Sequence, residues 1–311
     1  MPLSQVVGVT PQPRLTPYLS IDMFKNHRRR GVQVDNLVPR GTPAEQDAAL
    51  AEVIESASAW IDNTVLGILA ATSDTELRQV NVDRNGYAAI HPRFRPVIAL
   101  TAFQIGPTPA LMQALTDLTG TGVELNRFAV PTSPLNLTSS AGPLQFGNTT
   151  APADRQWVQY TYQNGYPVTT LTAPAALGAT SIAVADTTGI VPGQTWLTIY
   201  ALQSRIRFQA GAVSTAPSGG VGTGPGTVGC PALASAVPNN PSYPTMVSAL
   251  PPDIIEACVL VCRAIIKETG GGSVVASGNR SITAGDKDPF GAGDDYVEAE
   301  AFLRPYMVPW E

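Results

Sequence analysis

The side chains best suited to chemistry in this sequence are three cysteines and two histidines. Cys258 and Cys262 stand four residues apart in an apolar segment, about one turn of a helix. A metal site needs further ligands at suitable spacing, and the only others of these types are Cys230, His27 and His91. Neither histidine has a serine or cysteine partner at a recognisable catalytic spacing. We therefore expect thiols that pack as small hydrophobic groups, with no metal and no cofactor.

Carboxylates and glycines cluster without forming a catalytic or phosphate-binding motif. Asp286, Asp288, Asp294 and Asp295 lack the glycine and the distal glutamate of an EF-hand calcium loop. The glycine-rich stretch 219–224 does not lie between a strand and an amphipathic helix, so we interpret it as a loop. Walker, dinucleotide-binding, zinc-protease and nucleophile-elbow motifs do not occur in the sequence. We expect a protein that is not an enzyme.

Charge is scarce in this chain and unevenly distributed. Only 14% of the 311 residues are charged, which suits a protein that buries much of its surface against neighbours. Residues 1–40 hold six basic and two acidic residues, whereas residues 286–311 hold seven acidic and two basic ones. The two ends are either solvated surfaces or complementary contacts between copies. The residues that would make such contacts are Arg28, Arg29, Arg30, Asp294 and Asp295.

The run of three arginines also has a nucleic-acid interpretation. Arginines can neutralise DNA phosphates, but no aromatic side chains alternate with Arg28–Arg30. A charge cluster at the end of a helix explains the run equally, because cations are favourable near a helix C-terminus.

Helical periodicity appears near both ends of the chain. Ser20 can cap a short helix that runs to about Arg29, and Thr42 with Glu45 forms a capping box for a stronger helix ending near Thr64. A third helix over 252–268 is apolar nearly all round, so it is buried between elements or between subunits. A fourth is expected over 294–304. We expect packing between copies through Leu50, Val53, Ile54, Trp60, Ile255, Val259 and Ile266.

In the region between the N-terminal and C-terminal helices, the hydrophobic period changes to two residues, which predicts strands. Asn85-Gly86 is typical of a type I′ hairpin turn, and Ala110 to Leu118 has the composition of a helical turn. The fold class is therefore α+β: a helical domain formed by N- and C-terminal segments and interrupted by a large β-rich, barrel- or sandwich-like insertion. The expected strands cover 77–83, 87–91, 96–105, 123–130, 156–162, 181–185, 196–200 and 205–210.

Composition also divides the chain into four regions. They are an extended arm over 1–17, a helical domain over 18–77 and 250–304, a β-rich insertion over 78–249 and a tail over 305–311. The tail combines aromatic and aliphatic residues with two prolines, which favours docking into a pocket on another protein. The docking residues are Pro305, Tyr306, Met307, Val308, Pro309 and Trp310. No signal peptide opens the chain and no apolar run reaches about 18 residues, so we expect no membrane contact.

Several segments that follow one another along the chain form a recognisable pattern: Tyr18–Lys25, Ala57–Asp62, Val82–Gly86, His91–Val97, Gly178–Ile182 with Pro192-Gly193, and Leu250–Ile254. In this order they resemble the head-to-tail adaptor (connector) proteins of long-tailed bacteriophages, in particular those of actinobacterial phages. The chain departs from the smallest members by its large β insertion, and it has Pro238-Asn239-Asn240-Pro241 where a histidine-glycine pair is usual.

This resemblance implies a ring, usually of twelve copies, beneath the portal of the capsid. In the family the helical domains pack side by side, the C-terminal tail reaches the portal, and DNA passes through the channel without sequence-specific contact. The implied partners are further copies of the chain, the portal protein, the next connector or stopper on the tail side, and the genomic DNA. The implied location is the virion, with assembly in the host cytoplasm.

The β-rich insertion supports an alternative function as a module that binds a glycan or receptor at a virion or cell surface. Its aromatic residues include Trp157, Tyr166 and Trp196, and Tyr160 and Tyr162 share one strand face through their period-two spacing. That shared face is either a binding face or a core face.

Overall fold

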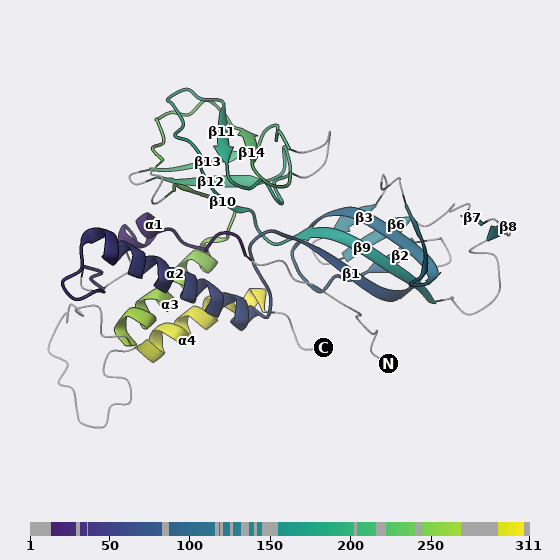
Figure 1. The fold of residues 1–311 in the computed structure, drawn as a ribbon, viewed down its shortest axis with the longest axis horizontal. Helices are drawn as coiled ribbons and strands as arrows, with labels where there is room; N and C mark the ends of the chain where they lie inside the picture. The colour runs from purple at the N-terminus through teal and green to yellow at the C-terminus, as the bar shows by residue number, and fades with distance from the viewer. Residues whose placement is uncertain are drawn as a thin grey trace. The chain divides into compact units, whose positions relative to one another are not determined.

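A computed structural model gives the chain an α+β fold with several antiparallel sheets and few helices, as the sequence predicts (Figure 1). The described residues divide into two compact units: one lies within Ala71–Tyr166, and the other lies within Arg14–Ala70 and Pro167–Glu311. The residues that the structure describes are 14–28, 32–35, 37–82, 87–115, 118, 121–124, 127–131, 137–139, 142–144, 155–201, 204–215, 222–239, 244–268 and 292–307.

The first unit is built from antiparallel strands. A four-stranded sheet has the order β1-β9-β3-β4, and a three-stranded sheet has the order β2-β6-β5. A short hairpin, β7-β8, completes the described strands of this unit. The bounds are β1 Thr72–Asn81, β2 Tyr87–Ile90, β3 Val97–Thr108, β4 Leu111–Ala114, β5 Gly122–Glu124, β6 Arg127–Pro131, β7 Leu137–Ser139, β8 Gly142–Leu144 and β9 Arg155–Asn164.

Both sheets contribute to the hydrophobic core of this unit. Strand β9 alternates strictly along most of its length, so that Val158, Tyr160 and Tyr162 are buried. Phe128 from β6 meets both tyrosine rings edge-on, with ring centroids 6.2 and 5.8 Å away. Such edge-to-face contacts add stability beyond the buried area, because each ring edge faces a negative ring surface.

Two expectations for this unit differ from the structure. The helical turn expected over 110–118 is replaced in its described part by a strand, because Leu111–Ala114 pairs with β3 as an edge strand. Strand β1 begins at Thr72 rather than at Leu77, so the helical segment ends before residue 77. The predicted Asn85-Gly86 turn lies outside the described residues, while an antiparallel bridge joins Val82 to Ala88 beside it.

The second unit contains a compact β part. A four-stranded sheet has the order β10-β15-β12-β13, and β11 pairs with β14. Their inward residues form one core that includes Ile182, Leu197, Ile199, Phe208 and Val247. The bounds are β10 Val168–Thr170, β11 Ser181–Val184, β12 Trp196–Ala201, β13 Ser204–Gln209, β14 Gly226–Gly229 and β15 Met246–Ser248.

The helices of the second unit begin where the sequence places their caps. The Ser20 side chain accepts a hydrogen bond from the Met23 amide, and Thr42 forms the predicted capping box with Glu45. The first helix stops at Lys25, earlier than the expected end near Arg29. The bounds are α1 Ile21–Lys25, α2 Pro43–Val65, α3 Pro252–Glu268, α4 Ala292–Leu303 and the 3₁₀ turn η1 Arg304–Tyr306.

Helix α3 is the apolar helix of the sequence, and it lies between α2 and α4 (Figure 1). Ten of its residues are buried, among them Ile254, Cys258, Val259 and Cys262. Since α2 and α4 cover it from two sides, the near-continuous apolar surface is satisfied largely within one chain. The two thiols are buried as expected, and burial raises the pKa of Cys262 well above its ordinary value.

The capping box makes the stability of α2 depend on pH. The Glu45 carboxylate accepts a hydrogen bond from the Thr42 amide, which lowers the Glu45 pKa below 4.5. A depressed pKa adds stability above the unfolded value, and that contribution is lost as pH falls through the folded value. We expect Glu45→Gln to lower the melting temperature at pH 7 and the difference from wild type to shrink below about pH 4.5. Thermal unfolding followed by circular dichroism measures both.

The matched control is Glu52→Gln, which removes one negative charge from the exposed face of the same helix. A melting-temperature difference for Glu45→Gln that stays constant from pH 7 to pH 3 would contradict the role of its carboxylate.

Candidate functional site

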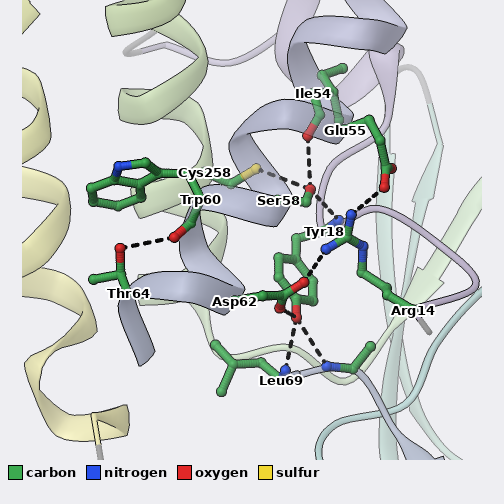
Figure 2. A network of polar contacts seen from close by, with 11 residues as sticks. Arg14, Tyr18, Ile54, Glu55, Ser58, Trp60, Asp62, Thr64, Leu69 and Cys258 are labelled. Atoms are coloured by element: carbon green, nitrogen blue, oxygen red, sulfur yellow. Dashed lines mark hydrogen bonds and ion pairs between the residues drawn. The ribbon is translucent and has the colours of Figure 1, made fainter. Parts of the chain in front are cut away.

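The most connected group of polar side chains in the helical region centres on Tyr18 and Asp62 (Figure 2). The Tyr18 hydroxyl donates to Asp62 Oδ1 and accepts from the Leu69 amide at 2.8 Å. Tyr18 is fully buried, and burial followed by the charge of Asp62 raises its pKa far above the ordinary value. The hydroxyl therefore keeps its proton and remains a donor to Asp62.

Arg14 balances the charge of Asp62. Its guanidinium donates to Asp62 through Nη1 and to Glu55 through Nη2, and it lies 5.1 Å from the centre of the Tyr18 ring. Burial alone would lower the Arg14 pKa, but the charges of Asp62 and Glu55 raise it above the ordinary value. The guanidinium thus stays charged and joins residues 14–18 to two turns of α2.

A second set of hydrogen bonds fastens the same segment through Ser58. The Tyr18 amide donates to Ser58 Oγ at 3.1 Å, and that hydroxyl donates to the Ile54 carbonyl at 2.8 Å. Ser58 Oγ also lies 3.9 Å from Cys258 Sγ on α3 (Figure 2). These contacts tie the N-terminal segment, the exit of α2 and α3 to one another. We call the group formed by Arg14, Tyr18, Glu55, Ser58 and Asp62 the Tyr18 cluster.

Helix α4 is held on α3 by a charged group of its own. Asp295 is 3% exposed and accepts from Arg263 Nε at 2.8 Å and Lys267 Nζ at 2.7 Å. The hydrogen bond to Asp295 raises the Arg263 pKa, which favours the charged pair. Trp60 of α2 stacks against Tyr296 of α4 with ring centroids 5.4 Å apart. The three long helices are therefore joined by polar and aromatic contacts as well as by their core.

Most side chains expected to pack between copies are buried within their own chain. Leu50, Ile54, Ile255, Val259 and Ile266 are at most 5% exposed, so their surfaces are not available to a neighbour. The sequence left open whether the apolar faces are buried between elements or between subunits, and the structure buries these five between elements. Val53 and Trp60 are half-buried and keep some accessible surface.

The charged residues that the sequence suggests for contacts between copies also differ in exposure. Arg28 and Asp294 are exposed, whereas Asp295 is buried against α3, where it accepts from Arg263. Arg29 and Arg30 lie outside the described residues. The sequence places the two aspartates side by side, but a helix points neighbouring residues in different directions.

The predicted docking tail is described only in part. Pro305 is exposed, and Tyr306 and Met307 are half-buried at the end of α4, where Arg304–Tyr306 forms the turn η1. The remaining tail candidates, Val308, Pro309 and Trp310, lie outside the described residues.

The first unit contains a buried carboxylate that sequence reasoning missed. Glu76 is fully buried and accepts from the Tyr160 hydroxyl at 2.7 Å and the Tyr162 hydroxyl at 2.6 Å. It also accepts from Arg78 Nη2 and the Arg93 amide, each at 2.8 Å. Tyr160 and Tyr162 are therefore core residues, and the binding-face interpretation of these two tyrosines is wrong. Thr72, Asp74 and Glu76 alternate as buried residues along β1, but Ser73 and Thr75 between them are also polar, so no hydropathy alternation in the sequence marks Glu76 as buried.

Among the described residues, no group of three or more histidine, cysteine, aspartate or glutamate side chains is arranged to hold a metal ion. Within those same residues, no helix has the length and apolar character needed to cross a bilayer.

Comparison with known proteins gives one structural similarity. No family model and no curated protein matches the chain. Among solved structures it is similar to a chain of the "Neck of empty GTA particle computed with C6 symmetry". The two share 13% sequence identity, the match covers 98% of this chain and 97% of the other, and the TM-score is 0.39.

Removing the Tyr18 hydroxyl tests the Tyr18 cluster. Tyr18→Phe removes the hydroxyl that accepts from the buried Leu69 amide and donates to Asp62 Oδ1, while Arg14 still donates to Asp62 Oδ2. We expect a loss of about 1–3 kcal/mol in the free energy of unfolding, because unpaired buried groups keep their full desolvation cost. Urea unfolding followed by circular dichroism measures the loss.

Glu55→Gln is the matched control within the same cluster. The Glu55 side chain is 60% exposed, so its ion pair with Arg14 is screened by solvent and should contribute less than about 1 kcal/mol. Equal losses for the two variants would contradict the assignment of Tyr18 and Asp62 as the centre of the cluster.

Proposed function

We propose that this chain is a structural protein of a phage-like particle that connects the DNA-filled head to the tail. Copies of it form a ring, of twelve subunits by analogy with the family it resembles, which binds beneath the portal and continues the DNA channel. The ring also binds the next connector or stopper on the tail side. The protein is a component of the virion after assembly in the host cytoplasm, and it functions by shape and binding rather than by catalysis.

One observation carries this proposal. Two of the segments that resemble the adaptor family, Tyr18–Lys25 and Ala57–Asp62, lie far apart in the sequence and meet in the structure through the hydrogen bond from Tyr18 to Asp62. Ser58, which lies within the second segment, accepts from the Tyr18 amide. The residues behind the resemblance thus form one contact in the helical region rather than a scatter of unrelated matches.

Charge supports the same function. A channel that conducts DNA must not retain it, and a chain of net charge −5 has no general attraction for phosphate. In the first unit both oxygens of the buried Glu76 carboxylate accept hydrogen bonds, so this group stabilises the fold.

Particles assembled without this chain test the proposed function most simply. We expect DNA-filled heads and separate tails to accumulate, and supplying the wild-type chain to restore joined particles. Electron microscopy of the lysate distinguishes these outcomes. Normal numbers of joined particles in the absence of the chain would overturn the proposal.

A truncated chain lacking 305–311 tests the role of the tail. We expect the helical circular dichroism signal to be retained, because α4 ends at Leu303 and the described residues that are removed, Pro305, Tyr306 and Met307, are exposed or half-buried. We also expect heads that are not joined to tails, because the apolar side chains that dock on the portal are missing. The control is Leu177→Ala, which removes a side chain that is 68% exposed elsewhere in the same unit. Joined particles with the truncated chain would show that the tail does not dock.

A further inference from the structure

The outer face of the β12–β13 hairpin carries two arginine–aromatic pairs. Arg207 lies over the Trp196 ring at 5.3 Å, and Arg205 lies over the Tyr200 ring at 5.5 Å. Strand pairing places these four residues on one face, since Leu197, Ile199 and Phe208 point into the core. Trp196 is 51% exposed and both arginines are exposed. We call these four residues the stacked-arginine face.

The contact with an aromatic ring prepares these arginines to bind an acidic group. A guanidinium held over a ring loses side-chain freedom before any partner arrives, and it still offers N–H donors in a planar fork. That fork matches a carboxylate bidentately. The half-exposed indole beside it offers an apolar surface for a side chain next to the carboxylate.

The outward surface of α4 has the complementary composition. Asp295, Ala299 and Leu303 point inward, so the opposite side of the helix presents Asp294 and Val297 to solvent. Val297 is 68% exposed and adds an apolar side chain to this surface. Glu298 follows one turn after Asp294 and flanks the same surface. We call Asp294, Val297 and Glu298 the acidic α4 face.

The two carboxylates of the acidic α4 face and the two arginines of the stacked-arginine face are separated by similar distances. Asp294 and Glu298 stand four residues apart on a helix, which places their Cβ atoms about 6 Å from each other. Arg205 and Arg207 stand two residues apart on a strand, which places them about 7 Å from each other. Glu298 also raises the Arg263 pKa through its charge, but a carboxylate has about four acceptor sites and can serve a second guanidinium.

We infer that the stacked-arginine face of one copy binds the acidic α4 face of a second copy of this chain. The two faces differ, so the contact is head-to-tail, and repetition of such a contact closes a ring when the rotation allows it. The inference rests on the proposed ring and names surfaces that would join its subunits. A second copy is favoured over DNA because two arginines neutralise few phosphates, whereas the acidic face supplies two carboxylates and an apolar residue at matching positions.

Charge reversal on the full-length chain tests this contact. Sedimentation equilibrium should show self-association of the wild type with a Kd below about 1 mM, weakened by added salt. We expect Arg205→Glu with Arg207→Glu, and separately Asp294→Arg with Glu298→Arg, to weaken self-association by about tenfold or more. An equimolar mixture of the two double variants should restore it, because each reversed face then meets a reversed partner.

The mixture distinguishes a lost contact from misfolding. If the double variants were unfolded, mixing them would not restore a specific contact. Asp294→Arg alone serves as a second acidic-face variant that leaves Glu298 beside Arg263. The control for total charge is Arg40→Glu with Arg95→Glu, two exposed arginines outside the stacked-arginine face. This control should self-associate as the wild type does.

Three results would overturn the inference. One is a wild-type chain that stays monomeric up to about 1 mM. Another is a mixture of the double variants that associates no better than either alone. The third is loss of binding to a short DNA duplex or a glycan array in the Arg205/Arg207 variant with self-association unchanged, which would assign the face to that ligand. None of these results decides whether particles join without the chain, so the proposed function is tested separately.

Discussion

The helical region depends on the hydrogen bond between Tyr18 and Asp62. Asp62 has a side chain that is only 17% exposed, and a carboxylate removed from water in this way is stable only when its charge is compensated and its oxygens are hydrogen-bonded. Arg14 supplies the charge, Tyr18 supplies a donor, and the Leu69 amide uses the acceptor side of the same hydroxyl. Because each group completes another, removing any one leaves a buried partner unsatisfied.

This constraint determines how the helical segments are joined. The Tyr18 cluster fixes the chain before α1 to α2 and to the exit of α2 at Leu69. Asp295 performs the corresponding role between α3 and α4. With α3 enclosed in this way, the surfaces left for partners are the outward faces of helices and strands rather than the apolar stripes. A connector of this kind would keep its shape before it meets its neighbours.

The sequence predicts local structure well where backbone chemistry decides it. Ser20 and Thr42 cap helices because their side chains accept from amides that have no other partner, and Pro252 begins a helix at the position where proline is tolerated. The sequence predicts local structure less well where pairing with another strand determines the conformation. Leu111–Ala114 has helix-forming residues, yet pairing with β3 overrides that propensity.

The residue types of the candidate site could be predicted from the sequence, but the neighbours that each side chain faces could not. Leu50 and Val259 were recognised as members of apolar faces, but periodicity does not reveal which neighbour covers a face. Likewise, Asp295 was recognised as acidic, but its burial depends on Arg263 and Lys267. Glu76 went unrecognised because its tyrosine partners are contributed by β9, far along the chain. The Arg–aromatic pairs of β12–β13 could not be predicted without the strand register, which places their members on one face of the hairpin.

Native-state amide hydrogen exchange at Leu69 tests the central claim most directly. The Leu69 amide donates to the buried Tyr18 hydroxyl, so opening of the Tyr18 cluster must accompany its exchange. The account predicts that this amide is protected to nearly the same free energy as the core amides of α3, and that Tyr18→Phe removes much of that protection. Exchange of Leu69 at the rate of an unstructured peptide in the wild-type chain would contradict it.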